Sequence, residues 1–148
     1  MLKKIFAAAA FVAVLLPAQA QAQGTAPEAK AMLDKAVAAV KTDKAKALAA
    51  FEAGTDGFKD RDLYPFCFQV ADGITVAGPA SVKGKDVRTL KDTTGKTFGA
   101  EMFASASKEG AITEVSYSFP KPGQTESSPK VSFLTRAGDL VCGVGIYK

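Results

Sequence analysis

The chain has 148 residues, and 19 Lys and Arg against 15 Asp and Glu give it a net charge of +4. It contains no histidine, which excludes Ser-His-Asp and Cys-His catalytic centres and removes the commonest general acid–base group. Its lysines are scattered rather than gathered in a basic stripe, so we expect no nucleic-acid partner.

The N-terminal segment has the features of a secretory signal peptide. Lys3 and Lys4 precede an apolar run over residues 5–16, which Pro17 ends. This run is shorter than the roughly 20 residues that a membrane-spanning helix needs, although a retained anchor is the alternative. Two A-x-A sites follow, and we favour cleavage after Ala22. The sequence thus predicts a leader over residues 1–22, one domain over residues 23–148, a periplasmic or secreted location, and no membrane insertion after cleavage.

A helical segment follows the leader. Thr25 and Glu28 have the spacing of a capping box, and apolar residues then recur on one stripe as far as Phe51. Residues 41–43 are polar enough to divide this segment into two helices, and Gly54 is a stop signal for the second. We interpret the pair as scaffold that covers a core.

Strands dominate the rest of the chain. Residues 64–71 alternate with period two, a hairpin turn follows at residues 72–73, and residues 74–77 form a short second strand. A loop with one helical turn is expected over residues 80–95, and a helix over residues 97–108. Three further strands are predicted over residues 112–119, 130–136 and 140–147. The plan is α+β, with one antiparallel sheet.

Several short segments occur in the order found in single Cache domains of the second type. They are YPFCF (64–68), DG (72–73), GP (78–79), GKDV (84–87), DTTGK (92–96), YSFPKP (117–122), PKVSF (129–133) and VGIY (144–147). The chain resembles this family from residue 29 to residue 147. It departs from the pattern at Ala77, where a histidine is frequent, and at Phe119, where a tryptophan is common. No transmembrane or signalling segment follows Tyr147.

The resemblance implies a PAS-like five-stranded antiparallel sheet with an N-terminal helix on one side and a ligand pocket on the other. Such domains usually form the extracytoplasmic part of chemoreceptors and sensor kinases, and many bind small organic acids. We therefore expect a small-molecule ligand that bears a carboxylate, and action through a membrane receptor, kinase or transporter in signal transduction or chemotaxis. The alternative is a ligand-free structural or interaction protein of the cell envelope. We do not expect an enzyme.

The two cysteines, Cys67 and Cys142, are expected to form a disulfide. An exported chain meets an oxidising compartment, and the first and last strands of a PAS-like sheet are neighbours. If the cysteines face each other, Gly143 and Gly145 share their face with the phenylalanines of the first strand, so that small residues lie opposite large ones. Two buried free thiols are the alternative.

Lys130 is the predicted main contact for an anionic ligand, at the rim of the pocket, because it matches a lysine recurrent in the family pattern. Tyr117 and Arg88 are secondary polar candidates, and Phe66, Phe103 and Phe119 are expected to wall the site. The alternatives are plain core for the aromatic residues and an exposed strand-edge position for the lysine.

No metal or cofactor is predicted. Two cysteines without histidine supply too few soft ligands for zinc, and a c-type haem would need C-x-x-C-H. Four acidic residues could in principle hold a hard cation, but they lack the dense spacing of a calcium loop, so we interpret them as solvated carboxylates. They are Asp86, Asp92, Glu101 and Asp139.

Overall fold

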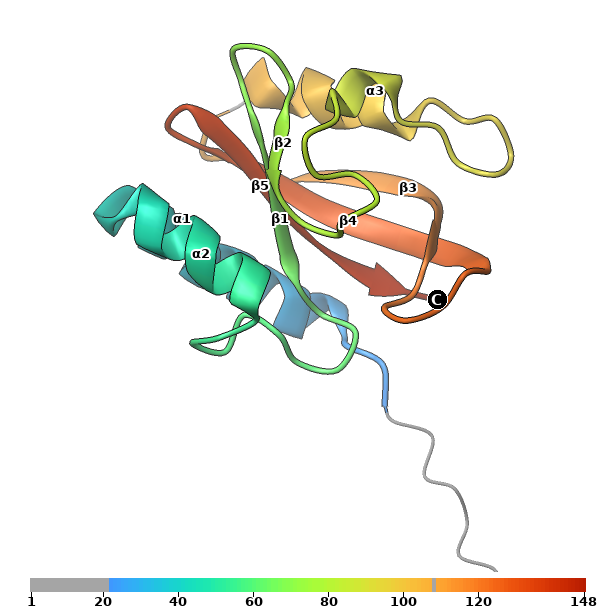
Figure 1. Ribbon diagram of the computed structural model, residues 1–148, viewed down its shortest axis with the longest axis horizontal. Helices are drawn as coiled ribbons and strands as arrows, with labels where there is room; N and C mark the ends of the chain where they lie inside the picture. The colour runs from blue at the N-terminus through green and yellow to red at the C-terminus, as the bar shows by residue number, and fades with distance from the viewer. Residues whose placement is uncertain (1–21, 108) are drawn as a thin grey trace, which may run out of the picture.

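The computed structural model describes residues 22–107 and 109–148, so residues 1–21 of the predicted leader lie outside the described residues. Five strands form one antiparallel sheet in the spatial order β2-β1-β5-β4-β3 (Figure 1). Their bounds are Pro65–Gln69 for β1, Thr75–Ala77 for β2, Thr113–Pro120 for β3, Ser127–Ala137 for β4 and Leu140–Tyr147 for β5. The predicted α+β architecture and its five-stranded PAS-like sheet are confirmed.

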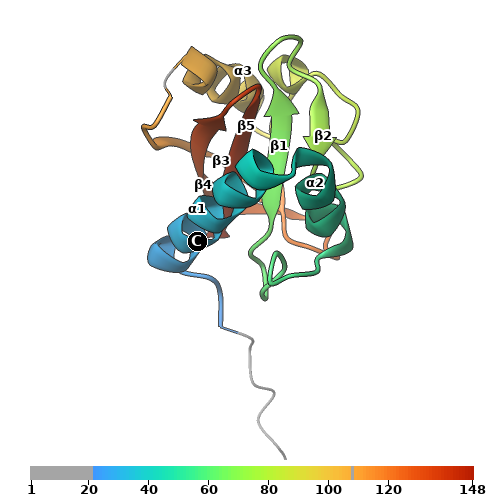
Figure 2. The same cartoon turned by 90° about the vertical axis from the view of Figure 1, so that its left-hand side faces the viewer.

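Helices α1 (Ala26–Thr42) and α2 (Lys44–Ala53) cover one face of the sheet (Figures 1 and 2). The Glu28 carboxylate accepts hydrogen bonds from the backbone and hydroxyl of Thr25, as a capping box requires. Asp43 separates the two helices and caps α2 by accepting from the Lys46 amide at 3.0 Å. Gly54, at φ 65°, ends α2 in the left-handed conformation that glycine adopts freely. The predicted division into two helices is correct.

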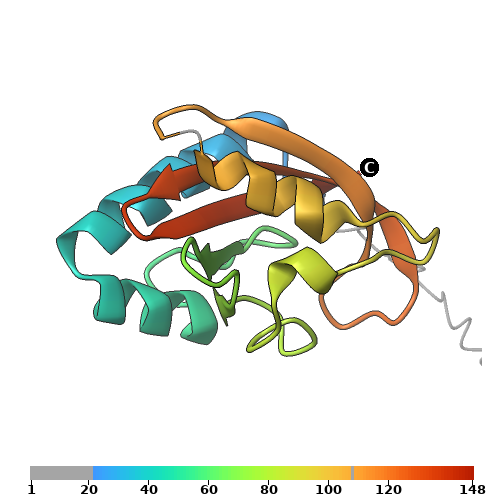
Figure 3. The same ribbon diagram turned by 90° about the horizontal axis from the view of Figure 1, so that it is seen from above.

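Helix α3 (Phe98–Ala104) lies on the opposite face of the sheet (Figure 1). The 3₁₀ turns η1 (Val87–Thr89) and η2 (Ser105–Ser107) flank it in sequence, and Figure 3 shows the β2–α3 connection running beside it. The sheet therefore separates two hydrophobic cores. The α1 face contains Leu33, Phe51, Cys67 and Phe133, among others, and the α3 face contains Phe66, Phe68, Met102 and Leu134. No helix within the described ranges is both long and apolar enough to cross a bilayer.

Two boundaries differ from the expectation by three residues or more. Strand β4 begins at Ser127, three residues before the predicted start, because residues 127–129 pair with the end of β3. Helix α3 ends at Ala104 and continues only as a 3₁₀ turn to Ser107. The first difference bears on the site, since it moves Lys130 from the start of a strand to its fourth position.

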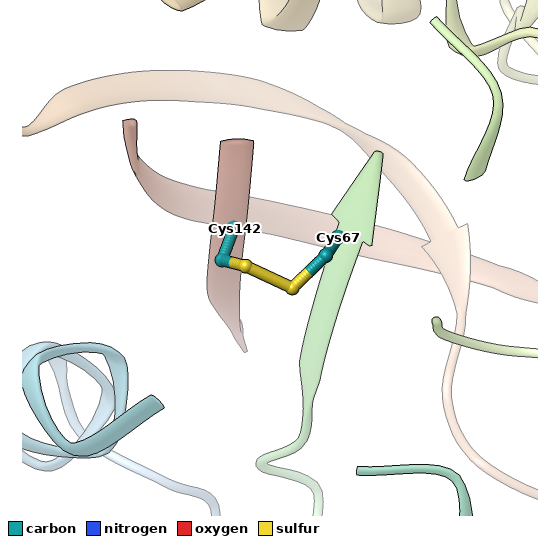
Figure 4. Close-up of a disulfide and its surroundings, with 2 residues drawn as sticks. All are labelled: Cys67 and Cys142. Carbon is teal, nitrogen blue, oxygen red and sulfur yellow. A yellow bond between two sulfur atoms is a disulfide. The ribbon is translucent and has the colours of Figure 1, made fainter. Parts of the chain in front are cut away.

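Cys67 of β1 and Cys142 of β5 form a disulfide (Figure 4). The two residues lie directly opposite each other in the strand register, with their Cα atoms 4.1 Å apart. Both side chains are buried on the α1 face, whereas Phe66 and Phe68 point to the α3 face, as the period-two alternation predicts. The predicted pairing is correct, and it joins segments that are 75 residues apart.

Candidate functional site

Lys130 lies in the interior of the sheet. Strand β4 runs between β3 and β5, where Lys130 is paired with Tyr117 on one side and Tyr147 on the other. The lysine is only 2% exposed. The alternative of an exposed strand-edge lysine is therefore wrong, and the lysine lies within strand β4 and not at its start, where it was predicted.

The Lys130 ammonium group contacts hydroxyls and aromatic rings. Its Nζ donates to the Tyr64 hydroxyl at 2.7 Å and to the Tyr147 hydroxyl at 3.3 Å. It also lies 4.4 Å from the centre of the Tyr64 ring and 5.3 Å from that of Phe119. Within residues 22–107 and 109–148, no carboxylate lies within ion-pair distance of this nitrogen. A buried cation is thus held by neutral groups.

Burial lowers the pKa of Lys130 to about 7, because a charged ammonium is disfavoured away from water. The charge of Asp62 acts in the opposite direction and favours the ammonium form. At neutral pH the side chain therefore divides between the ammonium and the neutral amine. The same burial raises the pKa of the Tyr64 hydroxyl far above its ordinary value and raises that of Tyr147 as well, so both remain protonated.

The hydroxyls around Lys130 form a short hydrogen-bonded chain. Tyr147 donates to the Pro120 carbonyl at 2.6 Å, and its oxygen lies 3.4 Å from that of Tyr64. With the Tyr147 proton committed to Pro120, Tyr64 is the donor between the two hydroxyls. Tyr64 and Tyr147 belong to the aromatic residues visible in the sequence, but their role as partners of Lys130 depends on contacts across the fold. No short motif encodes those contacts.

A small pocket lies between the sheet and α3, and we call it the Lys130 pocket. Lys130 and Tyr64 contribute polar groups to its lining. Its volume is about 30 Å³, little more than one or two water molecules occupy. Apolar side chains from the sheet, the β2–α3 connection and α3 make up most of its wall. The lining residues are Tyr64, Phe66, Thr75, Pro79, Val82, Val87, Leu90, Phe98, Met102, Tyr117, Phe119 and Lys130.

A larger hollow of about 430 Å³ adjoins this pocket, and we call it the outer groove. It lies between the end of α2, residues 78–81 and the β3–β4 turn. Tyr64, Pro79 and Phe119 line both spaces, so these three side chains form the partition between them. The groove is the larger of the two spaces and is within the range of ligand pockets, roughly 300–1,000 Å³.

The predicted site residues divide into two groups. Phe66, Tyr117, Phe119 and Lys130 line the Lys130 pocket together. The Tyr117 hydroxyl bonds to Ser132 Oγ at 2.8 Å, and its ring stacks on that of Phe98, so its polar atom is already partnered.

Arg88 and Phe103 lie outside this lining. The Arg88 guanidinium pairs with Asp86 at 2.6 Å and lies 5.0 Å from the centre of the Phe103 ring, and it is exposed. Phe103 packs on Phe68 at the other end of the α3 face. From α3 and the β2–α3 connection, the residues that line the pocket are Pro79, Val82, Val87, Leu90, Phe98 and Met102.

Gly143 and Gly145 make room for bulky neighbours, as expected, although their neighbours differ. A Cβ at Gly143 would lie 2.5 Å from Cζ of Phe66, in agreement with the small-opposite-large packing. A Cβ at Gly145 would instead meet the Lys130 stem and lie 2.6 Å from Ser132 Oγ. The second glycine therefore opens the space through which the lysine side chain crosses β5.

The acidic residues considered as cation ligands are dispersed. Asp86 pairs with Arg88, and Asp139 pairs with Lys44 at 2.6 Å. Asp92 organises a turn by accepting from the Thr94 hydroxyl and from the amides of Ser118 and Lys96, and these bonds, that of Thr94 most of all, lower its pKa to about 2. Across the part of the chain that the structure describes, no three acidic or cysteine side chains come together.

A model of the Cache domain family matches residues 29–148. The chain belongs to the Cache domain family. The resemblance inferred from the ordered segments is therefore confirmed. Among the curated proteins, none matches this Cache domain.

Three solved structures are similar to this Cache domain, and two of them come from chemotaxis proteins. A methyl-accepting chemotaxis protein from Vibrio parahaemolyticus has a TM-score of 0.65 and 25% identity, over 82% of this chain and 86% of that one. A periplasmic sensor domain of a chemotaxis protein has a TM-score of 0.60 and 25% identity, over 80% and 86%. A third structure, described as the basis for carboxylic acid recognition by a Cache chemosensory domain, shares the fold at 21% identity, with a TM-score of 0.61 over 80% and 84%.

Proposed function

We propose that this Cache domain binds a small carboxylate in the Lys130 pocket, outside the cytoplasm, and passes the signal to a membrane receptor, kinase or transporter. The buried Lys130 ammonium carries the proposal. Its Nζ has a third N–H beyond those given to Tyr64 and Tyr147, and a carboxylate would accept it. The relative described for carboxylic acid recognition supports the same class of ligand.

The size of the pocket limits how a ligand can enter. A space of about 30 Å³ holds water but not an organic acid, so binding must enlarge it. Pro79 and Val82 line one side of it, and the exposed ion pair between Lys83 and Glu52 joins this segment to α2. An exposed ion pair contributes only about 0–1 kcal/mol, so it resists opening weakly. Movement of Pro79 or Phe119 would join the pocket to the outer groove.

Calorimetric titration tests the proposal after a thermal-shift screen of C2 to C4 carboxylates, since a ligand bound only to the folded state raises the melting temperature. Replacing Lys130 by Ala should weaken binding roughly tenfold to a hundredfold, the value of one charge-assisted hydrogen bond. Lys91→Ala is the matched control, because Lys91 is exposed beside the pocket residue Leu90. An unchanged dissociation constant in Lys130→Ala would remove the lysine from the site.

A ligand-free structural or interaction role is the second candidate, and the small volume of the Lys130 pocket favours it. In that case Lys130 with its hydroxyl partners would serve only to fix the positions of β4, β5 and the segment before β1. No carboxylate in the screen would then shift the melting temperature of the wild-type protein. Pull-down with the wild-type chain would still recover a membrane partner.

A further inference from the structure

The neutral form of Lys130 has chemistry that carboxylate binding does not use. A neutral amine has two N–H groups and one lone pair. The two hydroxyl oxygens of Tyr64 and Tyr147 lie at 2.7 and 3.3 Å and can take both N–H groups. The lone pair then has no partner among the described residues, and Nζ lines a pocket that is otherwise almost entirely apolar. An unpaired amine lone pair in a dry pocket is a nucleophile.

We propose that the neutral Lys130 amine condenses reversibly with short aldehydes or keto acids, forming an imine inside the Lys130 pocket. The inference uses the pocket of the proposed function, but it needs no carboxylate on the ligand. The space of about 30 Å³ must enlarge for a carbonyl compound as it must for a carboxylate, so compounds of two or three carbons need the least opening. The domain would in this way retain reactive carbonyl compounds longer than an ion pair retains an acid.

Tyr64 is positioned to move the protons of this reaction. The Nζ lone pair adds to the carbonyl carbon, and the carbonyl oxygen takes a proton from the Tyr64 hydroxyl as the C–N bond forms. Nitrogen returns one of its protons to Tyr64, which leaves a neutral carbinolamine. That hydroxyl departs with a second proton as water, and the C=N bond remains. One amine and one carbonyl compound give one imine and one water, without an oxidant or a reductant.

Few charged groups face Lys130, which keeps the amine available near neutral pH. Tyr64 precedes β1, Tyr147 lies on β5 and Tyr117 on β3, and burial raises the pKa of each hydroxyl. The contacts from α3 are the apolar Phe98 and Met102. The one acidic influence is Asp62, which favours the ammonium form. With these neighbours, burial remains the dominant effect on the pKa of Lys130.

Reductive trapping with acetaldehyde and cyanoborohydride at pH 7 tests the inference, followed by peptide mass mapping. An ordinary lysine, with a pKa of about 10.4, is neutral in roughly one molecule in two thousand at pH 7, whereas a pKa of about 7 leaves about half neutral. Ethylation at Lys130 should therefore be at least about tenfold faster than at Lys91, even with restricted entry. The preference should disappear in urea after reduction, where both lysines are equivalent.

Two variants distinguish the reactivity of the Lys130 amine from its contribution to the folded structure. Lys130→Arg keeps a cation in the sheet and should show no selective trapping. Tyr64→Phe should slow trapping at Lys130 severalfold while its pH midpoint stays below 8, as expected for a positioning residue. Equal rates at Lys130 and Lys91 in the folded wild-type protein would overturn the inference.

The carboxylate-binding proposal and the imine proposal can be contradicted independently of each other. Propionate can bind as an anion but forms no imine. Selective trapping without any propionate binding would leave the imine inference standing and remove the carboxylate function. Propionate binding without selective trapping would leave the carboxylate function standing and remove the imine inference. If both hold, propionate should slow the trapping of Lys130 by competition.

Discussion

Lys130 is the residue at which stability and proposed function conflict. An unpaired ammonium inside a sheet costs free energy, since its desolvation is only partly offset by hydrogen bonds to Tyr64 and Tyr147. A methionine of similar length would fill the same space without that cost. The free-energy cost of burying Lys130 is understandable if the ammonium or the neutral amine binds a ligand.

Lys130→Met should stabilise the domain most at low pH. The folded pKa of Lys130 is about 7, below the ordinary value of 10.5, so between these values only the unfolded chain holds the proton. Wild-type stability therefore rises with pH across this window by up to about 1.4 kcal/mol per unit. The variant, which lacks the group, should be more stable than wild type by roughly 4 kcal/mol at pH 6, after about 1 kcal/mol for lost hydrogen bonds.

Urea denaturation of both proteins at pH 6, 7, 8 and 9.5 measures this difference. The advantage of Lys130→Met should shrink as pH rises and be smallest at pH 9.5. Higher pH is avoided because the raised pKa of Tyr64 and Tyr117 makes folding less favourable once those groups ionise in the unfolded chain. Lys91→Met, on the surface, should show a pH profile parallel to that of wild type. A constant difference between Lys130→Met and wild type would contradict the assignment.

Gly145→Ala should displace Lys130 without replacing any side chain that lines the pocket. The added methyl meets the lysine stem and Ser132 Oγ, and overpacking of this kind costs about 1–3 kcal/mol. Gly143→Ala is the comparison variant, since it crowds the wall residue Phe66 and not the lysine. Both variants should lower the midpoint of urea denaturation, but Gly145→Ala should change the rate at which Lys130 is trapped by acetaldehyde more than Gly143→Ala does. Equal trapping rates in the two variants would show that the lysine accommodates the methyl.

Strands β1 and β5 are the elements on which the disulfide and the pocket both depend. Cys67 points to the α1 face, and Phe66, one residue earlier, lines the Lys130 pocket on the other. The same strand pair therefore holds the covalent link on one side and a wall of the site on the other. The disulfide and the pocket wall together fix the register of β1 and β5, because a one-residue slip would exchange the two faces of a strand.

Loss of the disulfide should cost the domain about 4 kcal/mol in the chain-entropy model, for a loop of 75 residues. The Cys67→Ala, Cys142→Ala double variant should have a lower midpoint of urea denaturation, and reduced wild type should approach it. Intact mass after alkylation of denatured protein checks the bond itself. Uptake of two alkyl groups by unreduced protein would show that the thiols are free.

The sequence predicted the helices and strands better than it predicted the contacts between them. Period-two alternation around Cys67 gave the correct faces of β1, and polar residues near Asp43 gave the correct break between α1 and α2. The burial of Lys130 was not foreseen, because residues 127–129 look like a linker until they pair with β3. The hydroxyls of Tyr64 and Tyr147 lie 66 and 17 residues from Lys130, beyond the reach of any local pattern.

On the scale of the whole molecule, the sheet keeps the candidate site apart from the helical layer. The Lys130 pocket lies on the α3 face. Helices α1 and α2 cover the other face (Figure 1), and the disulfide is buried beneath them. The first residues in front of α1 are tied to the turn before β1. The Gly24 amide donates to Asp62 at 2.7 Å, and Arg61 bonds to the Gln23 carbonyl at 3.3 Å. The residues immediately after the predicted cleavage site therefore take part in the folded domain.

Secretion from a bacterial host should give a mature protein of residues 23–148, with the mass of one disulfide. Cleavage after Ala22 leaves the contacts of Gln23 and Gly24 intact, so the processed chain keeps the bonds that tie its N-terminus to the turn before β1. Intact mass of the periplasmic fraction measures the cut. Ala22→Leu is the control, because a large residue at that position should block this site and shift cleavage to Ala20. A wild-type mass that includes residues 1–22 would contradict the predicted leader, and would mean that the segment stays attached as an anchor.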